Sequence, residues 1–223
     1  MRLASFPRFP LTTTPTPLNR ARNLELALGP GCPRLYLKRD DLTGLAFGGN
    51  KARKLEYVLA DAIGRGATVL ITEGAAQSNH ARLTAAAATA AGLKAVLVLD
   101  ARHGADVQGN LFLDRLMNVD VRIVPAPPER AAAIAAVLEE LKAAGEVPYA
   151  IPTGASIPLG ALGYVAFVLE LTSQLLSVGE SPSRLYFASG SGGTQAGIVV
   201  GTRAFNAPFV PVGVSDGDPA AVL

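Results

Sequence analysis

The chain has 223 residues, of which 49% are hydrophobic and 17% are charged, and its formal net charge is +2. The single cysteine, Cys32, excludes a disulfide scaffold, and with only two histidines beside it no structural metal site is expected. A small and interspersed net charge argues against nucleic acid or an acidic membrane as the main partner. The low share of charged residues indicates a globular protein with a large interior.

The N-terminal residues, 1–20, are rich in Pro and Thr and predict an extended arm across a domain surface. They contain early arginines but no continuous apolar stretch, so we expect no signal peptide and a cytoplasmic protein. The longest uncharged stretch, residues 147–169, reaches the length of a membrane-spanning helix but contains three prolines and three glycines. No bilayer helix is expected there.

The pattern of apolar residues alternates between strands and helices. After a short strand within residues 34–41, helical spacing predicts a helix from Asn50 to the glycines at 64 and 66. Further strands are expected at 68–72, 95–99, 121–124, 184–188 and 210–214, and further helices at 81–92, 108–117, 129–144, 160–176 and from Gln195 onward. Strands that alternate with helices imply parallel pairing with right-handed crossovers, and therefore an α/β fold.

A glycine-rich loop, SGSGGT from Ser189 to Thr194, joins an expected strand to an expected helix. In open α/β sheets ligands bind outside the carboxyl ends of strands. The glycines let backbone amides converge, and the helix start adds partial positive charge, so the loop suits a phosphate. It matches neither the Walker nor the dinucleotide fingerprint, because Gln195 stands where each requires a glycine. A small phosphate monoester fits better, and a plain tight turn is the alternative.

A second loop, GGNK, places Lys51 at the start of the first long helix, with Arg53 and Lys54 in the same turn. A cation at the positive end of the helix dipole costs up to about 1 kcal/mol. The simpler interpretation is a solvated basic helix end. The alternative is that repulsion and burial lower the pKa of one amine, which makes it a nucleophile, while another amine binds an anion.

A third loop, EGAAQSNH, puts Gln77, Ser78, Asn79 and His80 at the end of a buried strand. Ser78 or Asn79 can cap the helix that follows, a role worth about 1 kcal/mol. His80 can be a hydrogen-bonded structural histidine. The other interpretation is that these side chains hold a substrate at the strand end.

Four segments taken together, GGNKARKLE, EGAAQSNHARLTAA, PYAIPTGASIPLGALGY and ASGSGGTQAG, resemble the D-cysteine desulfhydrase and 1-aminocyclopropane-1-carboxylate (ACC) deaminase family. The resemblance runs from about residue 15 to about residue 214, in order and with similar spacing. It implies a pyridoxal-phosphate enzyme with the two-domain parallel-sheet α/β fold of the tryptophan synthase β-like type, fold type II. On this basis we expect a larger cofactor domain of residues 1–51 and 163–223 and a smaller inserted α/β domain of residues 52–162.

The resemblance also implies roles for the residues of the three loops. Lys51 would bond covalently to pyridoxal 5′-phosphate and, with Ser78, act in catalysis. Lys54 and the glycine loop would hold the phosphate, and Asn79 would contact the ring oxygen. The implied cofactor-binding residues are Asn50, Lys51, Lys54, Asn79, Gly190, Ser191, Gly192, Gly193 and Thr194, and the implied substrate-binding residues are Gln77, Ser78, Asn79 and His80. No metal is implied.

The reaction implied by the resemblance is β-elimination and deamination of a small amino acid. The segment ASIPLGALGY favours conversion of D-cysteine to pyruvate, sulfide and ammonia, and the alternative is an ACC deaminase that gives 2-oxobutyrate and ammonia. Family members are usually dimers and continue beyond the point that corresponds to Val214, with late tyrosines and a partner for the pyridine nitrogen. The chain is therefore expected to lack a C-terminal portion and to expose apolar surface on its larger domain. An inactive cofactor-binding or oligomerising remnant is the alternative from another class.

Overall fold

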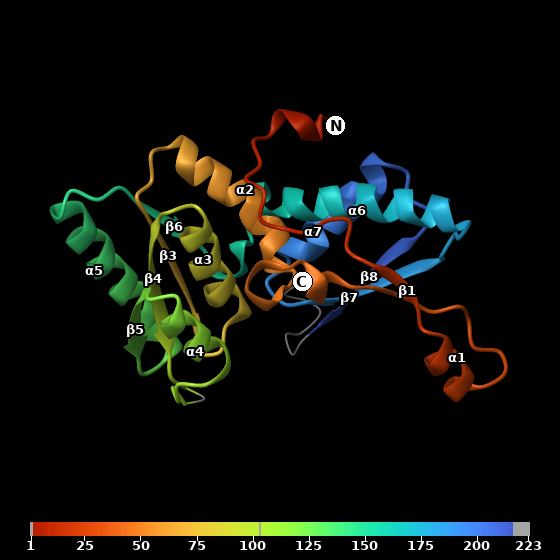
Figure 1. The fold of residues 1–223 in the computed structure, drawn as a ribbon, viewed down its shortest axis with the longest axis horizontal. Coiled ribbons are helices and arrows are strands. Elements are labelled where there is room, and N and C mark those ends of the chain that lie inside the picture. Colours follow the sequence, from red (N-terminus) through yellow and green to blue (C-terminus); the bar gives the residue numbers. More distant parts are fainter. Residues whose placement is uncertain (1, 103, 216–223) are drawn as a thin grey trace.

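The computed structural model describes residues 2–102 and 104–215, which form two lobes side by side along the longest axis (Figure 1). The helices are α1 (Arg22–Leu28), α2 (Lys51–Gly64), α3 (Asn79–Ala90), α4 (Gly109–Leu116), α5 (Arg130–Ala143), α6 (Pro158–Val178) and α7 (Gly193–Ala204). The strands are β1 (Leu18–Arg20), β2 (Tyr36–Lys38), β3 (Val69–Ala75), β4 (Lys94–Asp100), β5 (Asp120–Val124), β6 (Pro148–Ile151), β7 (Arg184–Ser189) and β8 (Val210–Ser215).

The first lobe is built on a parallel four-stranded sheet with the order β5-β4-β3-β6. Its inner strands β3 and β4 are buried over most of their length, which explains their nearly continuous apolar sequences. Val69 and Ile71 face α5, whereas Leu70 faces α2 and α3, as the two-residue alternation of a strand requires. The predicted parallel pairing is confirmed. All four strands lie within residues 52–162, and the exact domain boundaries stay a prediction.

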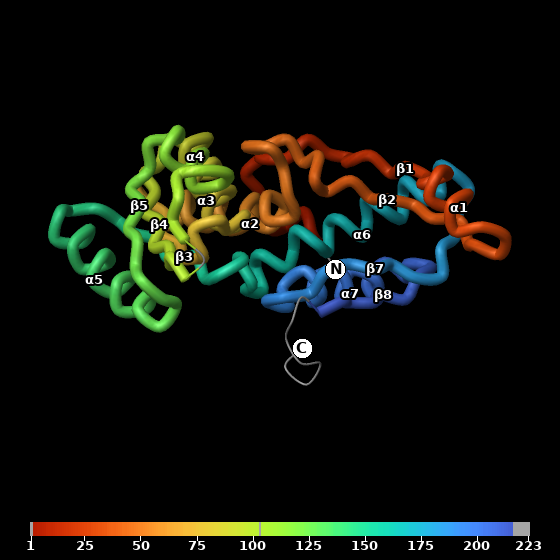
Figure 2. The backbone as a smooth tube through the Cα atoms, turned by 90° about the horizontal axis from the view of Figure 1, so that it is seen from below, coloured from red at the N-terminus to blue at the C-terminus, as the bar shows by residue number. Residues whose placement is uncertain are grey.

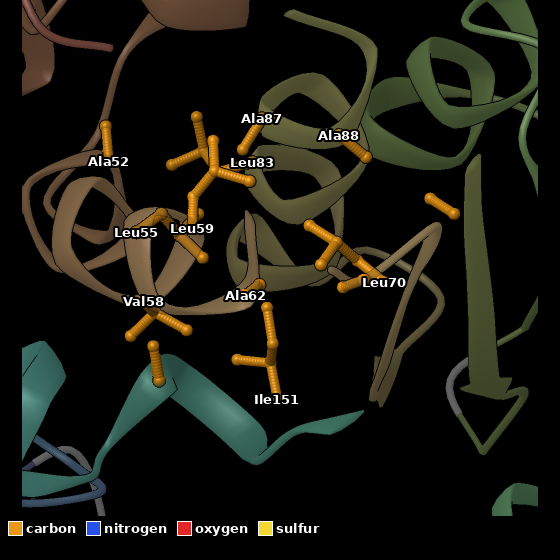
Figure 3. Close-up of a cluster of buried hydrophobic side chains, with 13 residues drawn as sticks. Ala52, Leu55, Val58, Leu59, Ala62, Leu70, Leu83, Ala87, Ala88 and Ile151 are labelled. Carbon is orange, nitrogen blue, oxygen red and sulfur yellow. The ribbon is translucent and has the colours of Figure 1, made fainter. Parts of the chain in front are cut away.

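The main apolar cluster fixes α2 against the sheet. Figure 3 shows the side chains of Leu55 and Leu59 on α2 next to Leu83 on α3, with Leu70 and Ile151 from the sheet nearby. These side chains are almost completely buried. Because α2 begins at Lys51, this packing also fixes where its first turn lies relative to the carboxyl ends of the strands.

The second lobe contains two separate small sheets, an antiparallel pair β1-β2 and a parallel pair β7-β8. Helix α6 runs the length of this lobe (Figure 2) and packs against both α2 and α7. The close packing depends on glycine: a Cβ at Gly163 would lie 2.2 Å from the backbone oxygen of Arg53. A Cβ at Gly197 would lie 2.3 Å from the backbone oxygen of Ala161.

Gly163→Ala is expected to lower the free energy of unfolding by about 1–3 kcal/mol, because the added methyl group forces α6 away from α2. The control is Gly64→Ala in α2, where a Cβ would meet nothing within 4 Å and alanine is the better helix former. Urea denaturation checks both variants. Equal stability of the two variants would contradict the close approach of α6 to α2.

Helix α6 is long and apolar enough, by length and composition, to cross a membrane. In this fold 50% of the most apolar 18-residue stretch of the helix is buried inside the protein. Glu170, in the middle of the helix, accepts hydrogen bonds of 2.9 Å from the guanidinium of Arg53 on α2. These contacts are those of a core helix.

The elements predicted from the alternating pattern are all present, with ends that differ by a few residues. Helix α7 begins at Gly193 rather than at Gln195, and β3 continues to Ala75. Three elements, α1, β1 and β6, were not predicted. Helix α1 is short and has no buried residue, while β6 is a short edge strand whose first residue is Pro148.

Candidate active site

The three loops that the sequence singles out border one cavity. This cavity has a volume of about 1120 Å³ and extends from the start of α2 into the second lobe. The predicted site residues that line it are Asn50, Lys51, Ser78, Asn79, His80, Gly190, Ser191, Gly192 and Thr194. The carboxyl end of β3 and the loop after β7 therefore meet beside the first turn of α2.

Lys51 is positioned by an unusual turn immediately before it. Ala46, Phe47, Gly48 and Gly49 all have positive φ angles, of 42°, 69°, 73° and 132°. Such backbone is strained for Ala and Phe and persists only where neighbours hold it. Gly49 donates its amide hydrogen to Thr43 Oγ1 at 2.8 Å, and this hydroxyl donates to the backbone oxygen of Gly49 at 3.1 Å.

Arg82, from the first turns of α3, holds the same strained segment from the other side. Its buried guanidinium donates to the backbone oxygens of Ala46 and Gly48, the latter at 3.0 Å. It also donates to Asn79 Oδ1 at 3.3 Å. One side chain therefore joins the loop that carries Lys51 to the loop that carries Asn79. The sequence did not point to Arg82, because an arginine on a helix is usually solvated.

The turn Thr153–Ala155 closes the space between Lys51 and the glycine loop. Gly154 has a φ of 69°, and a Cβ there would lie 3.6 Å from Lys51 Cε and 2.8 Å from Ser191 Oγ. Only a glycine fits this close approach. The hydroxyl groups of Ser156 and Ser191 lie 2.6 Å apart and share a hydrogen bond.

An anion cradle forms where α2, the Thr153–Ala155 turn and α7 meet. Lys54 Nζ donates to the backbone oxygen of Gly154 at 3.1 Å and to Ser156 Oγ at 3.4 Å. A Cβ at Gly193 would lie 2.8 Å from both Lys54 Nζ and Ser156 Oγ, so the absence of a side chain at Gly193 lets both groups lie close to the start of α7. An ammonium, two hydroxyls and the amides of a helix N-terminus are a suitable donor set for a phosphate. Ser156 was missed, because a serine in a turn is common.

The sequence hypothesis linked a lowered pKa to the nucleophilic amine. The structure instead places a lowered pKa at Lys54, the amine expected to hold the phosphate. Burial first, and the nearby charge of Lys51 second, lower the pKa of Lys54 to about 7. Its side chain is almost completely buried. An anion in the cradle would stabilise the ammonium form and raise this pKa again.

Binding of inorganic phosphate at pH 8 is therefore expected to be coupled to proton uptake by Lys54, whose pKa in the free chain is about 7. Calorimetry in two buffers of different ionisation enthalpy measures this uptake. In Lys54→Met the uptake should disappear and the affinity should fall about tenfold or more. Wild-type binding that does not depend on the buffer would contradict the assignment of Lys54.

Three of the four polar residues after β3, namely Ser78, Asn79 and His80, line the cavity. Ser78 Oγ accepts a hydrogen bond of 3.2 Å from the amide of Ala81, which confirms that Ser78 caps α3 and leaves its own hydroxyl proton available to donate. Asn79 borders the cavity, and its Oδ1 accepts from Asn110 Nδ2 at 3.0 Å. His80 is buried, lies 2.8 Å from Thr72 Oγ1, and is neutral because burial above all lowers its pKa to about 3.

Gln77 does not reach the cavity. It is exposed, its Nε2 donates to the backbone oxygen of Gln108 at 3.0 Å, and its Oε1 accepts from the amide of Asn110 at 2.8 Å. The side chain thus holds the start of α4. The geometry gives no support to a role for Gln77 in substrate binding.

Arg53 lies between Lys51 and Lys54 in sequence but points away from the cradle. It donates to both carboxylate oxygens of Asp40 and both of Glu170, and Glu170 also accepts from Lys38. Burial opposes ionisation of Glu170, but the hydrogen bonds from Arg53 and Lys38 outweigh it and hold the pKa at about 2. This buried network ties α2 to α6 and to β2.

No group of three or more His, Cys, Asp or Glu side chains suited to a metal ion occurs among residues 2–102 and 104–215. The donors at the cavity are amines, hydroxyls and amides, which suit an anion rather than a cation.

Comparison with known proteins agrees with this geometry. The family model "Pyridoxal-phosphate dependent enzyme" matches residues 10–221. A putative ACC deaminase of Pyrococcus horikoshii is 43% identical over 217 residues, which is 96% of this chain and 64% of that protein. A D-cysteine desulfhydrase of Serratia proteamaculans is 42% identical over 209 residues, 91% of this chain and 62% of that protein. The crystal structure of an ACC deaminase homologue has a TM-score of 0.86 at 42% identity and covers 97% of this chain and 65% of its own.

The chain thus spans less than two thirds of the length of these relatives. The matched region includes all three loops of the cavity and the anion cradle. The chain belongs to the family of pyridoxal-phosphate-dependent enzymes, with the α/β architecture of fold type II and with the ACC deaminases and D-cysteine desulfhydrases among its relatives.

Proposed function

We propose that this chain binds pyridoxal 5′-phosphate and carries out β-elimination and deamination of a small amino acid. The proposed substrate is D-cysteine. One observation carries the proposal: Lys54 and Ser156 of the anion cradle bond to Gly154 and Ser191, and these two residues line the same cavity as Lys51. A cofactor with an aldehyde and a phosphate needs these two features within reach of each other.

The residues present fit this cofactor. Lys54, Ser156, Ser191 and the amides at the start of α7 would hold the phosphate, and Asn79 would contact the ring. When bound, the cofactor supplies an aldehyde that reacts with amines and a ring that accepts electrons from the substrate α-carbon.

Lys51 can act as a nucleophile toward the aldehyde and as a base at the substrate α-carbon. The rigid turn before Lys51 keeps the backbone fixed, so that only the flexible side chain has to move. The hydroxyl proton of Ser78 can be donated to a substrate carboxylate, because the cap uses only the acceptor side of that oxygen. His80 is neutral and hydrogen-bonded to Thr72, so its contribution is to shape the cavity wall.

D-cysteine is preferred to ACC as the proposed substrate for a chemical reason and a sequence reason. D-cysteine has an α-proton that Lys51 can remove, whereas ACC has none and its ring must be opened in another way. The segment ASIPLGALGY also favours the desulfhydrase branch. ACC deamination is the second candidate, supported by the relatives that carry that name.

The test incubates the purified chain with pyridoxal phosphate and each amino acid and measures sulfide, pyruvate and 2-oxobutyrate, with Lys51→Ala as the control. Pyruvate and sulfide from D-cysteine, without 2-oxobutyrate from ACC, are expected. 2-oxobutyrate alone would overturn the D-cysteine assignment in favour of ACC. Cofactor binding without turnover of either amino acid would overturn the proposed activity and favour a non-catalytic remnant.

A further inference from the structure

The N-terminal arm is bound to α2, the helix that begins at Lys51. In Figure 1 the arm passes α2 on its way to β1. Phe9 and Leu11 of the arm pack against the apolar cluster that fixes α2 to the sheet. The amide of Phe9 donates to the backbone oxygen of Glu56 on α2 at 2.9 Å. We call residues 8–13 the strap, because they are fastened to the helix that carries the candidate nucleophile.

The side chain of Glu56 is the main polar anchor of the strap. It is only 2% exposed. Its Oε1 accepts hydrogen bonds from the amides of Leu11 and Thr12 at 3.0 Å and 2.9 Å, and from Thr12 Oγ1 at 2.8 Å. Its Oε2 accepts from Arg8 Nε at 2.6 Å. Hydrogen bonds to a carboxylate are stronger than those between neutral groups, so this buried side chain holds the strap in one place.

The other end of the strap holds the segment that leads to Lys51. Thr13 donates its amide to the backbone oxygen of Thr43 at 2.9 Å. Thr43 is completely buried, and its hydroxyl accepts from the amide of Gly49 and donates to the oxygen of Gly49. The contacts thus lead from Glu56 through the strap, Thr43 and Gly49 back to the first turn of the same helix.

The turn at the end of this chain of contacts needs support from its neighbours. Ala46 and Phe47 have positive φ angles of 42° and 69°, and Phe47 is 83% exposed, so its side chain adds little packing. Arg82 holds the turn from one side, and the strap, by way of the Thr13 amide, holds it from the other. Helix ends fray most easily, so a relaxed turn would let Lys51 move. A displacement of about 1 Å can slow a reaction about a hundredfold.

We propose that Glu56 is a positioning residue for Lys51, which acts by fastening the strap that holds Thr43 and, through it, the turn before the lysine. The inference rests on the proposed function, in which Lys51 bonds to pyridoxal phosphate. Glu56 borders a different and smaller cavity, of about 250 Å³, together with Arg8. The strap should therefore act on the position of the lysine and leave the phosphate cradle of Lys54 unchanged.

Two variants at one position of the strap test its hold on the turn. Thr13→Pro removes the amide that bonds to Thr43, whereas Thr13→Val keeps the amide and a similar shape. In the apo chain, NMR amide exchange at Gly49 should become about tenfold faster or more in Thr13→Pro and stay unchanged in Thr13→Val. The amide of Ala81, which bonds to Ser78 in the cap of α3, is the internal control. No cofactor is present, so this measurement is independent of the proposed function.

The rate of cofactor attachment separates positioning from a general loosening of the fold. Borohydride-trapped labelling of Lys51 by pyridoxal phosphate should slow about tenfold or more in Glu56→Met and in Thr13→Pro. The affinity for inorganic phosphate, which reports on Lys54, should change less than about twofold. Glu56→Gln keeps an acceptor oxygen for the strap amides and should recover part of the rate. Urea denaturation identifies conditions in which each variant is folded, and the rates are compared there.

Unchanged exchange at Gly49 in Thr13→Pro would overturn the proposal, and so would labelling at the wild-type rate in Glu56→Met and Thr13→Pro. An equal loss of labelling rate and phosphate affinity would overturn it in favour of a purely structural role for Glu56. If Glu56→Met does not fold, Thr13→Pro, which leaves α2 intact, decides. Failure of the proposed function looks different: the wild-type chain takes no label at Lys51, while exchange at Gly49 still responds to Thr13→Pro.

Discussion

Lys51→Ala is expected to abolish covalent attachment of pyridoxal phosphate to this chain. Lys51 lines the cavity, whereas Lys54 is buried within the cradle and bonded to Gly154 and Ser156. The amine that reacts with the aldehyde should therefore be that of Lys51. Borohydride reduction followed by mass mapping of the labelled peptide measures the attachment.

Lys54→Ala is the matched control, one helical turn away on α2. It should leave the label on Lys51 but weaken cofactor affinity about 10–100-fold, because a charge-assisted hydrogen bond to the phosphate is lost. A label on Lys54 in the wild type, or a label that survives in Lys51→Ala, would refute the assignment of the two lysines.

Arg53→Met is expected to lower the free energy of unfolding by about 3–5 kcal/mol, because it leaves Asp40 without its ion pair and Glu170 with Lys38 as its remaining cation. The side chains of Arg53, Asp40 and Glu170 are only 3%, 15% and 14% exposed. Urea denaturation at pH 7 measures the loss. The control is Arg65→Ala, whose ion pair with Asp61 is at the surface and should contribute about 1 kcal/mol or less.

The loss of stability in Arg53→Met is expected to depend on pH and to be smaller in acid. The pKa of Glu170 is depressed to about 2 in the folded chain, so its contribution to stability is present above its unfolded pKa and is lost as the pH falls toward 2. The difference in stability between wild type and Arg53→Met should therefore narrow below about pH 4. A difference that stays constant between pH 7 and pH 3 would contradict the network.

The sequence predicted most of the fold because the fold depends on local apolar patterns. The continuous apolar runs of β3 and β4 and the helical spacing of α2 are visible in the sequence without knowledge of the contacts. Strand β6 and helix α1 were not visible, because one is a short strand that begins with Pro148 and the other has no buried face. Their positions depend on tertiary contacts.

The site was predictable to the level of loops but not to the level of every partner. Glycines after a strand and a lysine at a helix start indicated a phosphate site and a reactive amine. Arg82 and Ser156 became evident only from the structure, because their roles depend on contacts with Gly48 and Lys54 from distant segments. Gln77, in contrast, was predicted as a site residue because it is next to Ser78 in sequence, but its side chain bonds to the start of α4.

The most direct test of the central claim, that one cavity brings a phosphate cradle and a reactive lysine together, is a crystal structure of the chain with pyridoxal phosphate. We expect the phosphate among Lys54, Ser156 and the amides at the start of α7, with continuous density from the cofactor to Lys51 Nζ. A cofactor bound elsewhere, or a phosphate that makes no contact with Lys54 or the start of α7, would contradict the account.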